Sequence, residues 1–198
     1  MSDLHIRQRN DILWLILDRN PQNLLTVAML EQLSSALLKV VKKPPRLIVL
    51  TGMGEKAFCA GIEPSERSSS QQDILVRAAK QVDEAMEEVH ALNIPTVAVV
   101  KGSTLGAGCE LAVLCRMIIA RDDATFQFPP ASDRLFHHSV LDTLSTLSEK
   151  EEVHHLVESS QSFAVQDAMR LGMIDQLLSG KRFLQDTEEL LTMLVTTV

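Results

Sequence analysis

The stretch VVKGSTLGAGCELA, residues 99–112, decides how the rest of the chain is organised. It continues an apolar run that begins at Thr96, carries glycines at positions 102, 106 and 108, and then enters Glu110 and an apolar pattern typical of a helix. The sequence therefore predicts a strand, a glycine turn and the start of a helix. Such a turn leaves backbone N–H groups free to hold an anion, either a bound one or one that forms during a reaction.

A second glycine turn lies upstream, in the stretch KAFCAGIE at residues 56–63. Residues 58–60 could form a short strand that ends at Gly61. Two strand ends that each finish in a glycine turn can direct one N–H apiece at the same carbonyl oxygen, and a thioester held in this way is stabilised as it becomes an enolate. A carboxylate on the first turn of the adjoining helix would be well placed for acid–base work, and Glu110 has that position.

The motifs of two nucleotide-binding classes are missing from the 99–112 stretch. It lacks the Gly-Lys-Ser/Thr ending of a phosphate loop and the G-x-G-x-x-G order of a dinucleotide fingerprint. A site for a nucleoside triphosphate or for NAD is therefore not expected.

Composition predicts a globular protein with no nucleic-acid or membrane partner. The chain has 198 residues, of which 45% are hydrophobic and 23% charged, and its formal net charge is −7 without a basic run. No apolar run approaches the ~20 residues of a membrane span, and the N-terminus lacks the apolar centre of a signal peptide. We expect one domain and a cytoplasmic location.

Cysteine and histidine spacing gives no indication of a metal site. The three cysteines have no C-x-x-C spacing, so we expect them to be small buried hydrophobic residues. The histidines at 137–138 and 154–155 are adjacent pairs, whose side chains point in different directions in a helix or strand. We expect no bound metal.

Hydrophobic periodicity predicts strands that alternate with amphipathic helices, and hence an α/β fold with parallel pairing. Thr26 is the expected N-cap of the first helix, and Ser70-x-x-Asp73 resembles a capping box before the second. The expected strands are residues 12–17, 47–51, 58–60, 96–100, 117–120, 125–128 and 173–178, and the expected helices begin near 26, 70 and 110 and cover 135–147, 163–171 and 183–194.

The two glycine segments together resemble those of the crotonase (enoyl-CoA hydratase/isomerase) superfamily. Residues 56–63 are similar to its K-A-F-x-A-G-x-D segment, and residues 102–112 to its G-x-x-x-G-G-G-x-E-L-A segment. LDRNPQNL at 17–24 and DAMRLGMI at 167–174 resemble two further family segments. The resemblance implies a spiral of β-β-α units over a core domain, 1–178, with a shortened C-terminal helical portion, 179–198, as an appendage that could serve oligomerisation.

The resemblance also implies a site for acyl-CoA thioesters. The backbone N–H groups of Ile62 and Ala107 would hold the thioester oxygen, and Glu110 matches the first of two family glutamates. Coenzyme A would be part of the substrate, with no other cofactor, and the assembly would be a homotrimer or a dimer of trimers. The residues expected to bind substrate or CoA are Lys56, Ala60, Gly61, Ile62, Gly106 and Ala107.

Two departures from the family pattern bear on the reaction. Ala107 stands at the middle glycine, and Pro130 occupies the position of the second glutamate, so ordinary hydratase activity is not expected from the pattern. The candidates for a replacement group are Asp133, His137 and His138. Three functions stay open: an acyl-CoA isomerase, decarboxylase or hydratase with Glu110 as acid/base, a decarboxylase or dehydratase acting on an acyl group borne by a carrier protein, or a non-catalytic homologue that supports a partner enzyme.

Overall fold

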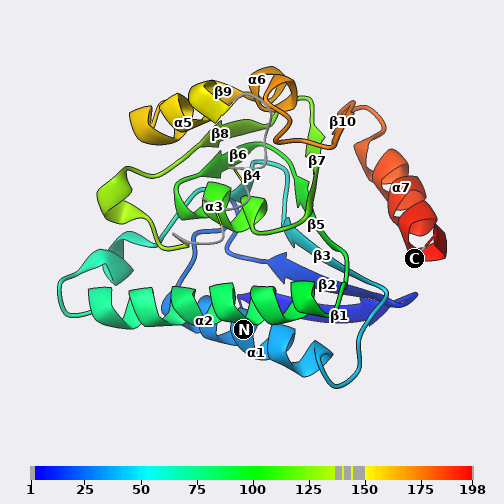
Figure 1. The fold of residues 1–198 in the computed structure, drawn as a ribbon, viewed down its shortest axis with the longest axis horizontal. Helices are drawn as coiled ribbons and strands as arrows, with labels where there is room; N and C mark the ends of the chain where they lie inside the picture. The colour runs from blue at the N-terminus through cyan, green and yellow to red at the C-terminus, as the bar shows by residue number, and fades with distance from the viewer. Residues whose placement is uncertain (1–2, 137–139, 141–143, 145–149, 198) are drawn as a thin grey trace.

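Two β-sheets with helices around them make up the fold in a computed structural model of the chain (Figure 1). The structure describes residues 3–136, 140, 144 and 150–197. Within these residues the larger sheet has six strands in the order β1-β2-β3-β5-β7-β10, and the smaller sheet has four in the order β4-β6-β8-β9.

The larger sheet is parallel except at its first edge. Strand β1 pairs antiparallel with β2, and the turn between them consists of Asn10 and Asp11, which both have positive φ values of 51° and 60°. Two such residues in succession are typical of a tight hairpin turn. Strands β2, β3, β5, β7 and β10 then pair in parallel. The six strands are β1 (Leu4–Arg9), β2 (Ile12–Leu17), β3 (Leu47–Gly52), β5 (Thr96–Val100), β7 (Met117–Arg121) and β10 (Gln176–Leu178).

The smaller sheet carries the two glycine segments. Its strands β4 (Ala57–Cys59), β6 (Ser103–Leu105) and β8 (Thr125–Gln127) pair in parallel, and β9 (Phe163–Ala164) pairs antiparallel with β8. Each of the first three strands follows closely on a strand of the larger sheet, namely β3, β5 and β7. The chain therefore winds through both sheets in successive turns of a spiral, which is the predicted architecture.

Helices α1 (Val27–Val40) and α2 (Gln72–Ala91) lie side by side along one face of the larger sheet (Figure 1). Helix α1 begins as expected at Thr26, whose Oγ1 accepts a hydrogen bond of 3.2 Å from the N–H of Met29. Alternate residues of β2, such as Leu13 and Leu15, point toward these helices and join the main hydrophobic core.

Helix α7 (Phe183–Thr197) covers part of the opposite face of the larger sheet. Its Phe183 and Leu191 are buried in a second hydrophobic cluster, which contains Ile12 and half-buried Trp14 of β2. The remaining described helices are short and lie in the connections between strands. They are α3 (Ala107–Val113), α5 (Lys150–Ser159), α6 (Val165–Arg170) and two short 3-10 helices, η1 (Pro64–Arg67) and η2 (Ala131–Asp133).

The structure confirms most predicted elements and corrects five expectations. Strand β1 was not expected, because its residues beyond His5 are exposed and give no apolar run. Strand β6 interrupts the expected glycine turn. Helix α2 begins after Gln71 with no side-chain cap, so the predicted capping box at Ser70 is wrong. The predicted helix at 163–171 starts with the short strand β9, and the predicted strand at 173–178 is limited to β10. The helix expected at 135–147 lies largely outside the described residues.

Candidate active site

The two glycine turns lie against each other at the ends of β4 and β6. The strands pair in parallel with Cys59 opposite Thr104, and each of these residues lies two positions before the glycine of its turn, Gly61 or Gly106. Gly61 and Gly106 turn the backbone with φ values of 111° and 56°, which only glycine adopts easily. A Cβ added to Gly106 would lie 3.9 Å from the Cα of Gly61, so the two turns are in contact distance.

One neighbouring backbone amide of each of Ile62 and Ala107 is engaged, whereas the amides of these two residues are not. The N–H of Glu63 donates to the carbonyl of Leu25 at 2.9 Å, and the N–H of Gly106 donates to the carbonyl of Gln127 at 2.8 Å. Among the described residues, no acceptor lies within hydrogen-bond reach of the N–H of Ile62 or of Ala107. Both residues are buried, so two unused donors remain at the junction of the turns.

Ala107 fits its position without strain. The positive φ of the turn belongs to Gly106, the N-cap of α3, and Ala107 is the first helical residue. A methyl group is acceptable at this point of a helix, whose first N–H groups have no intrahelical acceptor. The alanine therefore keeps the backbone donor that a glycine would supply.

Gly108 brings α3 close to β4. A Cβ at this position would lie 2.1 Å from the carbonyl oxygen of Cys59, far inside any normal contact. The absence of a side chain lets the first turn of α3 pack directly on the strand that leads to Gly61. This contact fixes the distance between the two turns.

Glu110 lies on the first turn of α3, three residues after Ala107, and its side chain is fully buried. Its Oε2 accepts a hydrogen bond of 3.2 Å from the N–H of Leu135, while its Oε1 is buried and has no partner among the described residues. Burial raises the pKa of Glu110 to about 7, against the opposing effect of the backbone N–H groups of Leu135 and Phe136. The carboxyl group can therefore exist in either protonation state near neutral pH.

Two charged side chains near Glu110 were not singled out in the sequence. The charge of Arg134 lowers the pKa of Glu110 and the charge of Asp83, on α2, raises it. Asp83 Oδ1 and Arg134 Nε are buried and, like Glu110 Oε1, have no partner in the described part of the chain. The only available signal for Asp83 was its place on α2 beside the apolar stripe, four residues after Ala79 and three before Met86.

The other predicted site residues lie around the first glycine turn. Lys56 is exposed at the start of β4, and its carbonyl accepts a hydrogen bond of 3.0 Å from the N–H of Ser103. The N–H of Ala60 donates to the carbonyl of Gln22 at 2.9 Å. Neither residue has a contact that assigns it to a ligand.

Neither the residue at the position of the second glutamate nor Asp133, a candidate to replace it, is buried beside Glu110. Pro130 is exposed. Asp133 forms a surface ion pair in which Arg67 Nη1 lies 2.8 Å from its Oδ2. His137 and His138 lie outside the described residues. The structure therefore brings Asp83 and Arg134 toward Glu110, and holds Asp133 at the surface.

Asn23 fixes the loop that leads into β4. Its side chain is fully buried, and its Nδ2 donates to the carbonyls of Met53 and Ala57, both at 2.9 Å. Its Oδ1 accepts from the N–H of Arg19 at 3.1 Å. One amide side chain thus ties the loop after β2 to the start of the strand that ends at Gly61.

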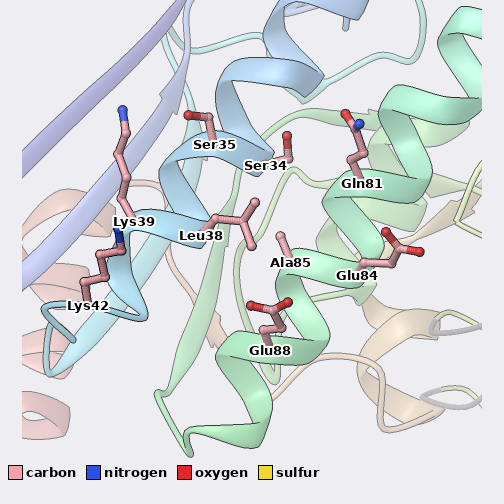
Figure 2. Close-up of a pocket in the computed structure, with 9 residues that line it drawn as sticks. All are labelled: Ser34, Ser35, Leu38, Lys39, Lys42, Gln81, Glu84, Ala85 and Glu88. Carbon is pink, nitrogen blue, oxygen red and sulfur yellow. The ribbon is translucent and has the colours of Figure 1, made fainter.

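A surface hollow of about 530 Å³ lies elsewhere, between α1 and α2 (Figure 2). Lys39 and Lys42 line its α1 side, and Glu84 and Glu88 line its α2 side. None of the predicted site residues contributes to its wall. The hollow is therefore distinct from the junction of the glycine turns.

Among the described residues, no three histidine, cysteine or acidic side chains come together in a group able to hold a metal ion. Cys59, Cys109 and Cys115 are free and buried, as expected from their spacing. In the described part of the chain, no helix combines the length and apolarity that crossing a membrane requires.

Comparison with known sequences gives a family match over nearly the whole chain. The model of a family described as enoyl-CoA hydratase/isomerase matches residues 7–198. A carnitinyl-CoA dehydratase of Proteus mirabilis (strain HI4320) is 26% identical over 201 residues, which cover 96% of this chain and 73% of that protein. A carnitinyl-CoA dehydratase of Escherichia coli (strain K12) is also 26% identical, with 98% of this chain and 75% of that protein covered.

Solved structures show the same fold. PA4980 of Pseudomonas aeruginosa is 27% identical, with a TM-score of 0.83 over 99% of this chain and 86% of that chain. Human enoyl Coenzyme A hydratase domain-containing protein 3 is 20% identical, with a TM-score of 0.83 over 98% of this chain and 78% of that chain. DspI of Pseudomonas aeruginosa is 18% identical, with a TM-score of 0.84 over 98% of this chain and 75% of that chain.

Proposed function

Because this chain belongs to the enoyl-CoA hydratase/isomerase family, we propose that it acts on acyl-CoA thioesters by stabilising an enolate and moving a proton at the carbon next to the thioester carbonyl. In this proposal the N–H groups of Ile62 and Ala107 hold the carbonyl oxygen, and Glu110 transfers the proton. Coenzyme A enters as part of the substrate.

The unused amides of Ile62 and Ala107 support the first part of the proposal. Backbone donors aimed at one oxygen stabilise the negative charge that develops when a thioester loses its α proton. Because both donors belong to folded backbone, they need no rearrangement when the charge appears. Loss of one such donor typically costs about 2.7 to 4 kcal/mol of transition-state stabilisation.

The unpartnered Oε1 of buried Glu110 is the observation on which the proposal chiefly depends. A buried carboxylate oxygen without a hydrogen bond is costly, so such an atom in a native protein calls for an explanation. Glu110 lies one helical turn from Ala107, and its pKa of about 7 suits a group that both takes and returns a proton near neutral pH. Proton transfer at the α carbon accounts for both properties.

We propose that the overall reaction is addition or elimination of water, with the enolate as its intermediate. The name carnitinyl-CoA dehydratase, borne by relatives that are 26% identical, favours elimination of water, and addition is the same reaction in reverse. Isomerisation and decarboxylation also proceed through an enolate and would use the same two amides.

Exchange of the α proton with solvent tests the proposal. Acetyl-, butyryl- and octanoyl-CoA are incubated with the protein in D₂O, and deuterium at the α carbon is measured by mass spectrometry. We expect exchange with the unaltered protein, at least 100-fold slower exchange with Glu110→Gln, and no change with Glu84→Gln, which alters an exposed glutamate on α2. Thermal stabilisation by these thioesters without any exchange would refute catalysis and favour a binding protein.

A further inference from the structure

Three residues whose charges interact at the candidate site each have a buried polar atom without a partner. These atoms are Glu110 Oε1 from α3, Asp83 Oδ1 from α2 and Arg134 Nε from the segment after η2, and no described residue offers any of them a hydrogen bond. Asp83 and Arg134 both lie close enough to Glu110 for their charges to act on it. Three segments that are distant in the sequence thus each contribute one buried, unused polar atom to the surroundings of Glu110.

Such a grouping is uncommon in a folded protein. Buried polar atoms nearly always have a hydrogen-bond partner, because a buried polar atom without one destabilises the folded protein. Two carboxylate oxygens that can accept and one guanidinium N–H that can donate form a complementary set for a small molecule with both capacities. Water has two donors and two acceptor positions, so it fits this set.

Asp83 is set apart from the other acidic residues of α2 by its position on the helix. Its neighbours on the same face, Ala79 and Met86, are buried in the core. Asp73, Glu84 and Glu88 are exposed. Asp83 therefore differs from these exposed acidic residues, because its Oδ1 atom is buried.

We propose that Asp83 is the second proton-transferring carboxylate of the site, and that it holds the reacting water together with Glu110 while Arg134 donates to the oxygen of that water. This inference rests on the proposed function. It assigns the role that Pro130 cannot take, since a proline side chain has no group that accepts a proton.

The hydration step balances with these residues and one water molecule. Asp83 takes one proton from water, and the water oxygen forms a bond to C3 of a 2-enoyl thioester. The electron pair of the C2=C3 double bond moves into the thioester to give the enolate, whose oxygen lies at the amides of Ile62 and Ala107. Protonated Glu110 then delivers its proton to C2, and the product is a 3-hydroxyacyl thioester. Asp83 afterwards releases its proton to solvent and Glu110 takes one up from solvent, so both carboxyl groups return to their starting states. Dehydration follows the same path in reverse.

Because Asp83 and Glu110 have different roles in this step, two assays can distinguish them. Exchange of the α proton of butyryl-CoA needs a base and the two amides, but it needs no reacting water. Hydration of crotonyl-CoA, followed by the loss of absorbance of the conjugated thioester, needs both carboxylates. Asp83→Asn keeps the size of the side chain and removes its ability to accept the proton.

We expect Asp83→Asn to slow hydration of crotonyl-CoA at least 100-fold and to change α-proton exchange less than 3-fold. Asp83→Glu should recover part of the hydration rate, and Glu84→Gln should leave both rates unchanged. Equal loss of both rates in Asp83→Asn would overturn the inference, because Asp83 would then act through the fold or through Glu110. Unchanged hydration in that variant would overturn it as well.

The unaltered protein separates failure of this inference from failure of the proposed function. Exchange without hydration of crotonyl-CoA or of 2-hexenoyl- and 2-octenoyl-CoA would overturn the role of Asp83 and leave the enolate chemistry in place. Absence of exchange would refute the proposed function itself.

Discussion

The backbone N–H of Leu135 donates a hydrogen bond of 3.2 Å to Oε2 of Glu110, so the segment after η2 covers the carboxyl group of α3. This contact holds the Glu110 side chain in one orientation and leaves its Oε1 without a partner. It also stabilises the ionised form, because an N–H group donates more strongly to a carboxylate than to a carboxylic acid.

Leu135→Pro removes that donor, and we expect the pH at which α-proton exchange is half-maximal to rise by about 1 unit. The hydrogen bond from Leu135 lowers the pKa of Glu110, so its loss raises that pKa above about 7. The measurement is kcat/KM for exchange as a function of pH, which reports the free enzyme. Leu135→Ala retains the N–H and should keep the original midpoint. A midpoint that stays in place in both variants would show that this bond does not control the carboxyl group.

Glu110→Gln should change how stability depends on pH. The pKa of Glu110 is raised from 4.5 to about 7 by burial, so the folded protein holds a proton that the unfolded chain releases between these values. The free energy of unfolding of the unaltered protein should therefore fall as the pH rises from 4.5 to 7, by up to about 3 kcal/mol from this group. In Glu110→Gln this contribution is absent.

Urea denaturation at pH 5, 6, 7 and 8 measures the difference between the two proteins. Burial lowers the pKa of His90 to about 4, and this group gives stability an opposite slope as the pH falls below 6.5. The His90 contribution is common to both proteins and cancels in the difference. Parallel curves for the two proteins would contradict a raised pKa at Glu110.

Gly108→Ala should destabilise the protein by about 3 kcal/mol or more. The added methyl group would lie 2.1 Å from the carbonyl oxygen of Cys59, which belongs to the backbone and cannot rotate away as a side chain would. Helix α3 would have to move away from β4, so exchange activity should fall as well. Gly180→Ala is a suitable control for urea denaturation, because its methyl group would meet the Asp122 side chain at 3.1 Å and that side chain can move. Equal stability of the two variants would count against the close contact.

Asn23→Ala should cost about 2 to 4 kcal/mol of stability, since it removes the donor to the carbonyls of Met53 and Ala57, the second of them in a buried hydrogen bond. The loop that enters β4 should loosen, and hydrogen exchange of the backbone amides in residues 53–59 should become faster. Gln22→Ala, which alters the exposed neighbour, should leave both measurements unchanged. Unaltered amide exchange in Asn23→Ala would show that the loop is held by other contacts.

Much of the fold was predictable because the parallel strands are buried and the glycines mark the turns. Residues 12–17 and 96–100 are continuous apolar runs, and Thr26 has the side chain that caps a helix. The edge strand β1 was missed because an edge strand needs no apolar run, and β6 was missed because three residues between glycines carry too little pattern. The capping box predicted at Ser70 was wrong because the sequence motif is present, but helix α2 begins one residue later, after Gln71, without a side-chain cap.

The site was predictable only where its residues are close together in the sequence. Ile62, Ala107 and Glu110 belong to two short segments with glycine at fixed positions. Asp83 and Arg134 come from elsewhere in the chain, and their proximity to Glu110 depends on how α2 and the segment after η2 pack. No periodicity in the sequence distinguishes an inward-facing aspartate from a solvated one.

The parallel register of β4 and β6 also bears on how the protein acquires its site during folding. Parallel neighbours must be joined by a long connection, here the entire helix α2, so their pairing closes a large loop and is slow compared with helix formation. The two glycine turns that carry the amide donors come together only once this pairing is complete. Recovery of thioester capture in a refolding experiment should accordingly mark a late kinetic phase, after the helical signal has returned.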